Sequence, residues 1–369
     1  MTVHEISLEG FRNYRKETVS LSPGINVISG ENAQGKTNLL EAVFLLSCGR
    51  GFRTRLDSEL ISFDADRARV EARVFSQERE QTVSVLMARG QRKQILVNGV
   101  RKNANELSDT VRVVLFCPDD LNMIREGAKE RRRFLDIAIS QLRPNYAKLL
   151  TDYNRLAENK RRILSDWREK PALLDALDAF SAQMARAGAQ LIRYRAAFCR
   201  RLAETASPIH SEFSGSGEEL RLEYKTVSTV TDPFSPASEI YAQIMEHQRA
   251  HREAEIASES LLTGIHKDDL EVSINGRSAR LYASQGQTRT AALSLKMAER
   301  EISMQDTGEC PILLLDDVLS ELDARRQEYV LNRIGGGQTL ITCCEDAGIR
   351  QRTGGNVFTV SAGTVREGN

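Results

Sequence analysis

The sequence lacks any long apolar run and any Cys-x-x-Cys pair. No stretch approaches the about 18 uninterrupted apolar residues that a membrane span needs, and the opening residues MTVHEISLEG carry no basic cluster followed by an apolar segment. We therefore expect no membrane span, no secretory signal and a cytoplasmic protein. The six cysteines show no metal-ligand spacing, so we expect buried, reduced thiols in place of disulfides or a zinc site.

The chain also lacks an excess of charge of either sign, with 51 basic and 51 acidic residues and a net charge of zero. A broad basic face is therefore not expected, and any contact with nucleic acid must come from local patches. The composition, with 41% hydrophobic and 28% charged residues, is that of a globular protein. At 369 residues the chain is long enough for two domains, or for one core with a large insertion.

A glycine-containing loop lies near the N-terminus. Residues 24–29, GINVIS, predict a buried strand, and the apolar run NLLEAVFLL from residue 38 predicts a helix. The loop between them matches the phosphate-binding pattern in its required context, which disfavours a chance match. Its glycines let backbone N–H groups converge on phosphate oxygens, and the helix N-terminus attracts anions. The loop consists of Gly30, Glu31, Asn32, Ala33, Gln34, Gly35, Lys36 and Thr37.

The last two residues of this loop predict the ligands. Lys36 supplies a flexible positive charge for the β- and γ-phosphates, and the Thr37 hydroxyl is suited to Mg²⁺. We expect ATP and Mg²⁺. The partner carboxylate is predicted at the end of the apolar run PILLLDD, where Asp316 would orient Mg²⁺ and Asp317 would position the attacking water. Solvated acids at an ordinary strand end are the alternative for this pair.

The distance between the two motifs is informative. Thr37 and Asp316 lie 279 positions apart, far more than a compact nucleotide-binding domain needs. A large segment is therefore expected between two halves of one sheet, as in ATPase heads of the SMC type. Upstream of Asp316, the loop SQGQTRT opens a predicted helix and forms a second candidate anion site. It resembles the ABC signature, which contacts a γ-phosphate held by a second subunit, and we assign this role to Ser284, Gln285 and Gly286.

Several further stretches give the chain a close resemblance, over nearly its whole length, to the RecF family of bacterial recombination and repair ATPases. They are LEGFRNY (8–14), GRGFRT (49–54), VLFCPDDL (114–121), ERRRFLD (130–136), TGIHKDD (263–269) and LLLDDVLSELD (313–323), the last resembling a Walker B strand with its D-loop. The chain departs from the family at Ile265, where proline is usual, at Cys117, where serine is common, and at residues 127–129. None of these departures touches the phosphate-binding loop.

The resemblance implies an α/β fold: a P-loop ATPase head of the ABC/SMC type, with a mixed sheet and helices, plus an inserted helical lobe. We expect the head at residues 1–121 and 261–369 and the lobe at 122–260. The implied function is DNA repair, recombination and replication, with support of the SOS response. An ATP-dependent homodimer would bind duplex DNA or a duplex/single-strand junction, irrespective of sequence, and would assist recombinase loading with RecO and RecR. Arg12 is implied near the nucleotide.

The predicted lobe is mainly helical, with helices at 130–141, 145–168, 173–206 and 236–255, breaks at prolines including Pro208, and one strand at 219–224. Two basic patches are candidates for contact with the DNA backbone, and a solvated helix face is the alternative. Without interleaved aromatic residues they do not predict base stacking. For His247 and His251 a solvated face is favoured over a metal site. The candidate DNA-binding residues are Arg131, Arg132, Arg133, Arg193, Arg195, Arg200 and Arg201.

Two other functions remain open on the sequence. An ABC transporter subunit would normally have a shorter segment between its motifs and a switch histidine after the QTLIT strand, which this chain lacks. A non-catalytic scaffold that keeps ATP as a structural ligand is disfavoured by the intact Lys36 and Asp316. Because Asp317 stands where ABC enzymes commonly have a longer glutamate, we expect a weak, DNA-dependent ATPase.

Overall fold

The computed structural model describes residues 1–54, 56–215, 217–344 and 347–368, which divide into two compact units. The first unit comprises residues 1–122 and 292–369, and the second comprises residues 123–291. The second boundary therefore lies at 291, whereas the sequence placed it at 260. The reason is strand pairing, because residues 269–274 pair with residues 220–225 inside the second unit.

The first unit contains an antiparallel sheet of six strands in the order β2-β1-β4-β5-β6-β7. In β4 the side chains alternate, with Ala68, Val70 and Ala72 buried and Arg69 and Glu71 between them, so one face of the sheet is a core face and the other is polar. The strands are β1 (Thr2–Phe11), β2 (Tyr14–Ser20), β4 (Arg67–Ser76), β5 (Arg79–Ala88), β6 (Gln94–Val97) and β7 (Val100–Lys102).

The second sheet of this unit joins the two ends of the chain and carries the nucleotide motifs. Its order is β15-β14-β3-β13-β12-β8, and all neighbours are parallel except β14 and β15. The Ile-Leu-Leu-Leu strand β12 is buried throughout, as expected for a central parallel strand. The predicted split sheet is therefore confirmed. Its strands are β3 (Ile25–Ser29), β8 (Val113–Phe116), β12 (Ile312–Leu315), β13 (Thr339–Cys343), β14 (Asn356–Ser361) and β15 (Thr364–Glu367).

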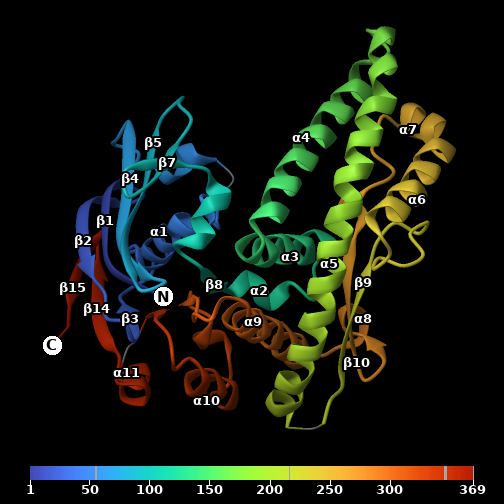
Figure 1. The fold of residues 1–369 in the computed structure, drawn as a ribbon. Coiled ribbons are helices and arrows are strands. Elements are labelled where there is room, and N and C mark those ends of the chain that lie inside the picture. Colours follow the sequence, from blue (N-terminus) through green and yellow to red (C-terminus); the bar gives the residue numbers. More distant parts are fainter. Residues whose placement is uncertain (55, 216, 345–346, 369) are drawn as a thin grey trace. The chain divides into compact units, whose positions relative to one another are not determined.

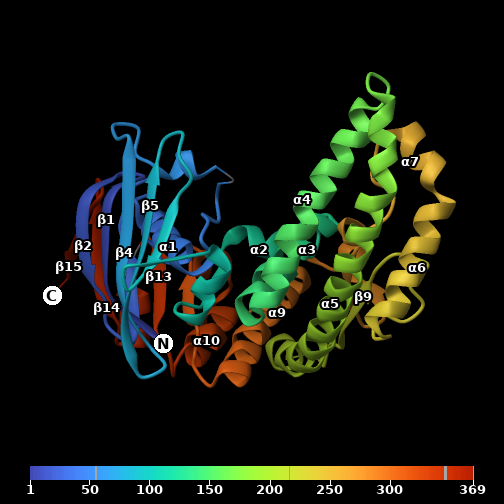
Figure 2. The same ribbon diagram turned by 45° about the horizontal axis from the view of Figure 1, so that its top comes forward.

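Helix α1 (Lys36–Cys48) lies between the two sheets of the first unit and contacts strands of both (Figures 1 and 2). Ten of its thirteen residues are buried, which explains why the sequence there is apolar all round. The other helices of this unit are α2 (Pro118–Asn122), α10 (Ala324–Arg333) and α11 (Ala347–Thr353), with the single turns η1 (Asp57–Leu60), η2 (Ala104–Asp109) and η5 (Leu319–Glu321). Helix α9 (Gln285–Thr307) begins in the second unit and ends in the first.

The second unit is built on α5 (Leu177–Ser214), which packs against α4, α6 and β9. The sequence placed a break at Pro208, but α5 continues through this residue to Ser214 and ends at Gly215 in the left-handed conformation. The buried side chains of Ala206 and Ile209 hold this last part of the helix in the core against the cost of the proline.

Helices α3 and α4 and strand β9 agree in type with the sequence prediction, whereas the helix predicted at 236–255 is divided at His251 into α6 and α7. A three-stranded sheet in the order β11-β10-β9 accompanies the helices, and its strands β10 and β11 were not predicted. The remaining elements of the unit are α3 (Ala128–Leu142), α4 (Pro144–Asp166), α6 (Ala237–Ala250), α7 (Arg252–Ser258), α8 (Ala279–Tyr282), β9 (Leu220–Lys225), β10 (Asp269–Ile274), β11 (Arg277–Ser278), η3 (Pro171–Ala176) and η4 (Ile265–Lys267). Among the described residues, no helix combines the length and apolar content that a membrane crossing requires.

Candidate nucleotide site

The phosphate-binding loop connects β3 to α1 and depends on two glycines. Gly30 has φ 148° and Gly35 has φ 120°, values that side-chain-bearing residues rarely adopt. A Cβ atom at Gly30 would lie 2.4 Å from the carbonyl oxygen of Val360, and one at Gly35 would lie 2.7 Å from Asn13 Nδ2. The backbone of the loop is therefore held close to two neighbouring segments, and no larger residue fits at either position.

The side chain of Lys36 bonds to the backbone of the phosphate-binding loop. Lys36 Nζ donates to the carbonyl oxygens of Gly30 at 2.6 Å and Glu31 at 3.0 Å, and its side chain is buried. Cys344 Sγ lies 3.8 Å from the same nitrogen and contacts Asn32 Oδ1 at 3.2 Å. All six cysteines are free thiols, but the expectation that they are buried holds only for Cys199 and Cys343. Cys344 is exposed, and the other three, Cys48, Cys117 and Cys310, are half-buried.

Residues outside the predicted nucleotide motifs hold the loop from two sides. From the β1–β2 turn, Asn13 Nδ2 donates to Gln34 O at 2.8 Å and the Tyr14 hydroxyl donates to Gly35 O at 3.0 Å. From the β14–β15 turn, the backbone N–H of Ala362 donates to Gln34 Oε1 at 2.7 Å. Asn13 and Tyr14 lie in the stretch LEGFRNY, which carried the family resemblance but no assigned role.

The carboxylate of Asp316 lies beside the threonine that ends the loop. Thr37 Oγ1 donates to Asp316 Oδ1 at 2.8 Å, and Thr342 Oγ1, at the end of the neighbouring strand β13, donates to the same atom at 2.9 Å. Burial raises the pKa of Asp316 above its usual value, and the two hydroxyl donors oppose this shift. A hydroxyl and a buried carboxylate at hydrogen-bond distance are hard oxygen donors of the kind that Mg²⁺ prefers, so the residues fit this ion.

Asp317, the second acid, lines a cavity of about 590 Å³ in the first unit. Its backbone has φ 50°, and its N–H donates to Thr342 Oγ1 at 2.8 Å, which fixes the turn after β12. The cavity is also lined by Asn32 of the phosphate-binding loop and Ser320 of the D-loop. The structure thus brings residues of three sequence motifs, Asp317 among them, to one cavity.

Arg12 is bound to helix α1. Its Nε and NH2 groups lie 2.8 Å from Glu41 Oε2, its NH1 donates to Glu59 O, and the Glu41 carboxylate is fully buried. The backbone of Arg12 has φ 53°, at the tight turn between β1 and β2. Its neighbour Asn13 contacts the loop directly, so Arg12 anchors the turn that supports the phosphate site. A contact of Arg12 with nucleotide stays a prediction.

The SQGQ loop lies in the second unit and caps helix α9. The Ser284 N–H donates to Gln287 Oε1 at 2.8 Å, and the Gln287 N–H donates to Ser284 Oγ at 3.2 Å. This reciprocal pair is a capping box with glutamine at its third helical position. Ser284 and Gln285 are exposed, and Gly286 is half-buried.

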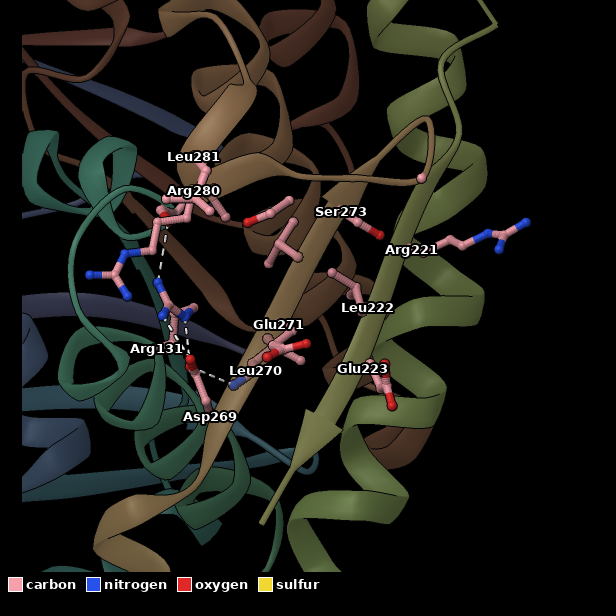
Figure 3. Close-up of a pocket in the computed structure, with 14 residues that line it drawn as sticks. Arg131, Arg221, Leu222, Glu223, Asp269, Leu270, Glu271, Ser273, Arg280 and Leu281 are labelled. Atoms are coloured by element: carbon pink, nitrogen blue, oxygen red, sulfur yellow. Dashed lines mark hydrogen bonds and ion pairs between the residues drawn. The ribbon is translucent and has the colours of Figure 1, made fainter. Parts of the chain in front are cut away.

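Two of the seven candidate DNA-binding arginines are buried, and the structure contradicts their assignment. Arg131 forms a two-bond ion pair with Asp269, at 2.7 and 2.9 Å, beside a cavity of about 750 Å³ (Figure 3). Arg195, 2% exposed, contacts Asp136 and Asp268 at 2.7 Å each and donates to the Ile265 carbonyl oxygen. Neither guanidinium group can reach a phosphate without breaking a buried ion pair.

The other candidate arginines differ in exposure. Arg132 is half-buried and donates to the Asp268 carbonyl oxygen, whereas Arg133 is exposed beside Glu130. Arg193 and Arg200 are exposed on α5, and Arg201 is half-buried. Arg200 also lies over the ring of Phe234, 4.6 Å from its centroid.

The histidine-containing segments have structural contacts. The rings of His247 and His251 stack with centroids 4.0 Å apart, and His247 Nδ1 bonds to Thr263 Oγ1. Asp268, in the TGIHKDD stretch, is fully buried and also accepts hydrogen bonds from Tyr224 and Thr226. These contacts give the TGIHKDD stretch a structural role within the second unit.

Comparison with known proteins places these features in a family. The family model of the RecF/RecN/SMC N-terminal domain matches residues 2–356. The DNA replication and repair protein RecF of Acetivibrio thermocellus is 38% identical over 346 residues, which cover 94% of this chain and 94% of the relative. The protein of the same name from Symbiobacterium thermophilum is 38% identical over 373 residues, covering 99% of this chain and 98% of the relative.

Solved structures give the same result. A structure of the recombination mediator protein RecF with ATPrS, in the RecFOR pathway, matches with a TM-score of 0.92 and 34% identity, covering 99% of this chain and 98% of that one. An Smc head domain derived from Pyrococcus furiosus matches with a TM-score of 0.57 and 17% identity, covering 99% and 95%, and shows a likeness of fold alone.

Proposed function

Because the chain belongs to the RecF branch of the RecF/RecN/SMC family, we propose that it is an ATP-dependent DNA-binding protein of recombinational DNA repair and replication. The observation that carries the proposal is the contact of Thr37 with Asp316 across 279 positions, which assembles the two halves of a nucleotide site. The family match runs through the helical insert as well as the head, which favours a repair ATPase over a transporter subunit.

ATP binds at the loop between β3 and α1. The backbone N–H groups of the loop surround the phosphates, and Lys36 turns from the Gly30 and Glu31 carbonyl oxygens to the β- and γ-phosphates. Thr37 and Asp316 are the residues that would hold Mg²⁺, which when bound neutralises negative charge on the phosphate oxygens. The braces from Asn13 and Ala362 keep the loop in one shape, so little conformational freedom is lost on binding.

Hydrolysis is slow and depends on Asp317. A carboxylate in the cavity beside the loop can orient a water molecule toward the γ-phosphate, but aspartate is one methylene shorter than the glutamate common in ABC enzymes. The weak activity fits a switch in which ATP binding forms the dimer and ATP hydrolysis dissociates it.

ATP acts by joining two copies of the chain. The nucleotide held by one copy meets Ser284, Gln285 and Gly286 of the other copy, whose capped helix N-terminus offers a hydroxyl and backbone N–H groups to the γ-phosphate. Because both copies contact the phosphate, ATP binds the dimer more tightly than the monomer and thereby stabilises the dimer.

DNA is bound through phosphate contacts and without sequence preference. The exposed arginines of α5 support this: Arg186, Arg193 and Arg200 recur every seven residues, which places them on one face at intervals of about 10.5 Å. Arg133 is a further exposed candidate on α3. A linear array of guanidinium groups suits a phosphate backbone, and its affinity falls steeply with salt.

The cellular setting follows from the relatives. We assign the chain to the cytoplasm and to the RecFOR pathway, with RecO and RecR as partners, a duplex or duplex/single-strand junction as substrate, and a role in recombinase loading and the SOS response. These assignments rest on the family and on no contact described above.

The proposal is tested by the anisotropy of a labelled duplex with a single-stranded tail, titrated with protein at several salt concentrations, with and without ATP. ATP should raise the DNA affinity of the wild type by about tenfold or more, and Lys36→Met should remove this effect. Lys16→Met, which removes an exposed lysine of β2, is the charge-matched control and should respond to ATP like the wild type. Equal affinity of the wild type with and without ATP would refute the proposal. ATP turnover measured in the same samples separates a weak ATPase from a non-catalytic scaffold.

A further inference from the structure

The SQGQ loop is bonded to a residue that no sequence motif includes. Gln287, the third helical residue of α9, uses both ends of its side-chain amide: Oε1 accepts from the Ser284 N–H, and Nε2 donates to Glu218 Oε1 at 2.8 Å. Glu218 lies in the segment between α5 and β9, 69 positions earlier in the chain. Its other oxygen, Oε2, lies 3.3 Å from Nε2 of His210, which is completely buried near the end of α5.

This arrangement determines which way the Gln287 amide faces. A carboxylate only accepts hydrogen bonds, so the amide must present its NH₂ group to Glu218. The amide oxygen is thereby turned to the Ser284 N–H, and the capping box closes. Within that box Ser284 Oγ accepts from the Gln287 N–H, so the hydroxyl proton can be donated to an anion.

We propose that Glu218 is a positioning residue for hydrolysis: through Gln287 it fixes the Ser284 hydroxyl and the first turn of α9 in the orientation that meets the partner's γ-phosphate. The inference rests on the proposed composite site. His210 Nε2 lies beside the same carboxylate at 3.3 Å and belongs to α5, the helix that also carries the exposed arginines Arg193 and Arg200. Glu218 is thus the connection between that helix and the SQGQ loop.

Glu218→Met is the informative variant, because methionine has a similar volume and offers no comparable acceptor to Gln287. Turnover at saturating ATP and DNA should fall about tenfold, the size expected for losing a charge-assisted hydrogen bond that orders a reacting group. The ATP affinity of the monomer should not change, since the loop that holds the nucleotide lies in the other unit. Glu218→Gln keeps an oxygen acceptor and should restore turnover to within about twofold of the wild type.

The matched control is the adjacent glutamate. Glu219 is exposed and its side chain contacts Arg221 on the surface, without a bond to the SQGQ loop among the contacts described for it. Glu219→Met should leave turnover unchanged. If Glu218→Met does not fold, Gln287→Glu tests the same bond, because it keeps an acceptor for the Ser284 N–H but has no NH₂ group to donate to Glu218.

A double-mutant cycle with Ser284→Ala decides between positioning and a general structural role. If Glu218 acts through Ser284, Glu218→Met should lower turnover little further in a Ser284→Ala background. Equal fractional losses in both backgrounds, or normal turnover of Glu218→Met while Ser284→Ala is impaired, would overturn the inference alone. Normal turnover of Ser284→Ala would overturn the composite site on which the inference rests, so the two failures are distinguishable.

Discussion

Two arginines of α5, two positions apart, should have opposite phenotypes. Arg195 contacts Asp136, Asp268, the Tyr146 hydroxyl and a backbone carbonyl, and it is 2% exposed. Arg193 is exposed on a different face of the same helix. We compare Arg195→Met with Arg193→Met, which remove the same charge and leave side chains of the same kind.

The stability difference follows from burial. Removing one partner of a buried ion pair costs about 3–5 kcal/mol, because the remaining carboxylate stays buried without its cation. Asp268, fully buried, is that carboxylate. For a unit of this size each kcal/mol corresponds to roughly 2–4 °C, so Arg195→Met should lower the melting temperature by on the order of 10 °C. Arg193→Met should stay within about 0.5 kcal/mol of the wild type.

The penalty of Arg195→Met also depends on pH. Burial raises the pKa of Asp268, and Arg195 opposes this rise. Without Arg195 the folded-state pKa rises further, so the protonated, uncharged form survives to higher pH. A group whose pKa is raised on folding stabilises the fold below its unfolded value and loses this contribution as pH rises through the folded value. The deficit of Arg195→Met should therefore be smallest in acid and grow toward neutral pH.

DNA affinity should be lowered by Arg193→Met and not by Arg195→Met, the opposite of their effects on stability. Arg193→Met should weaken DNA affinity and reduce the slope of log K against log salt by about one. Arg195→Met, assayed well below its melting temperature, should keep the wild-type slope. Calorimetry across pH together with salt-dependent anisotropy checks both variants. A melting temperature of Arg195→Met within 1 °C of the wild type, on the scale of the roughly 2–4 °C expected per kcal/mol, would refute the reasoning.

Two further predictions concern the nucleotide site. Because burial raises the pKa of Asp316 above that of an ordinary carboxylate, Mg²⁺-dependent ATP binding should fail on acidification at a higher pH than such a carboxylate would give. Asp316→Asn should bind Mg²⁺–ATP weakly at every pH. Calorimetric titration with Mg²⁺–ATP checks both, and a wild-type transition at the ordinary pKa of an aspartate would contradict the first expectation. Gly30→Ala should abolish ATP binding, because the added Cβ would lie 2.4 Å from Val360 O. The control Gly90→Ala is also at positive φ but has no atom within 4 Å, so it should retain ATP binding at a stability cost of about 1 kcal/mol. Equal ATP affinities for these two variants would contradict the described packing of the loop.

The phosphate-binding loop and its acid partner could be predicted because local pattern alone carries them. A strand, a glycine loop and a helix are contiguous for residues 24–48, and the buried strand before Asp316 is a plain apolar run. The braces at Asn13 and Ala362 come from turns at the two ends of the chain, and no local pattern reports such a meeting.

The burial of Arg195 is indicated by the sequence, because Leu191, Ile192 and Cys199 lie three or four positions away and place it on the apolar face of α5. For the contact of Glu218 with Gln287 no signal exists, because two polar residues 69 positions apart meet only through the packing of the second unit. The domain boundary at 291 also depended on a pairing that short strands do not reveal.

The central claim is that ATP, held at Gly30–Thr37, joins two copies of the chain. Sedimentation velocity of the wild type and Lys36→Met, each with no nucleotide, with ATP, and with ATP plus tailed duplex DNA, tests it most directly. We expect the wild type to be a monomer without nucleotide and a dimer with ATP, which DNA stabilises further, and Lys36→Met to be a monomer under all three conditions. A wild type that stays monomeric with ATP and DNA, or a Lys36→Met variant that dimerises equally well, would contradict it.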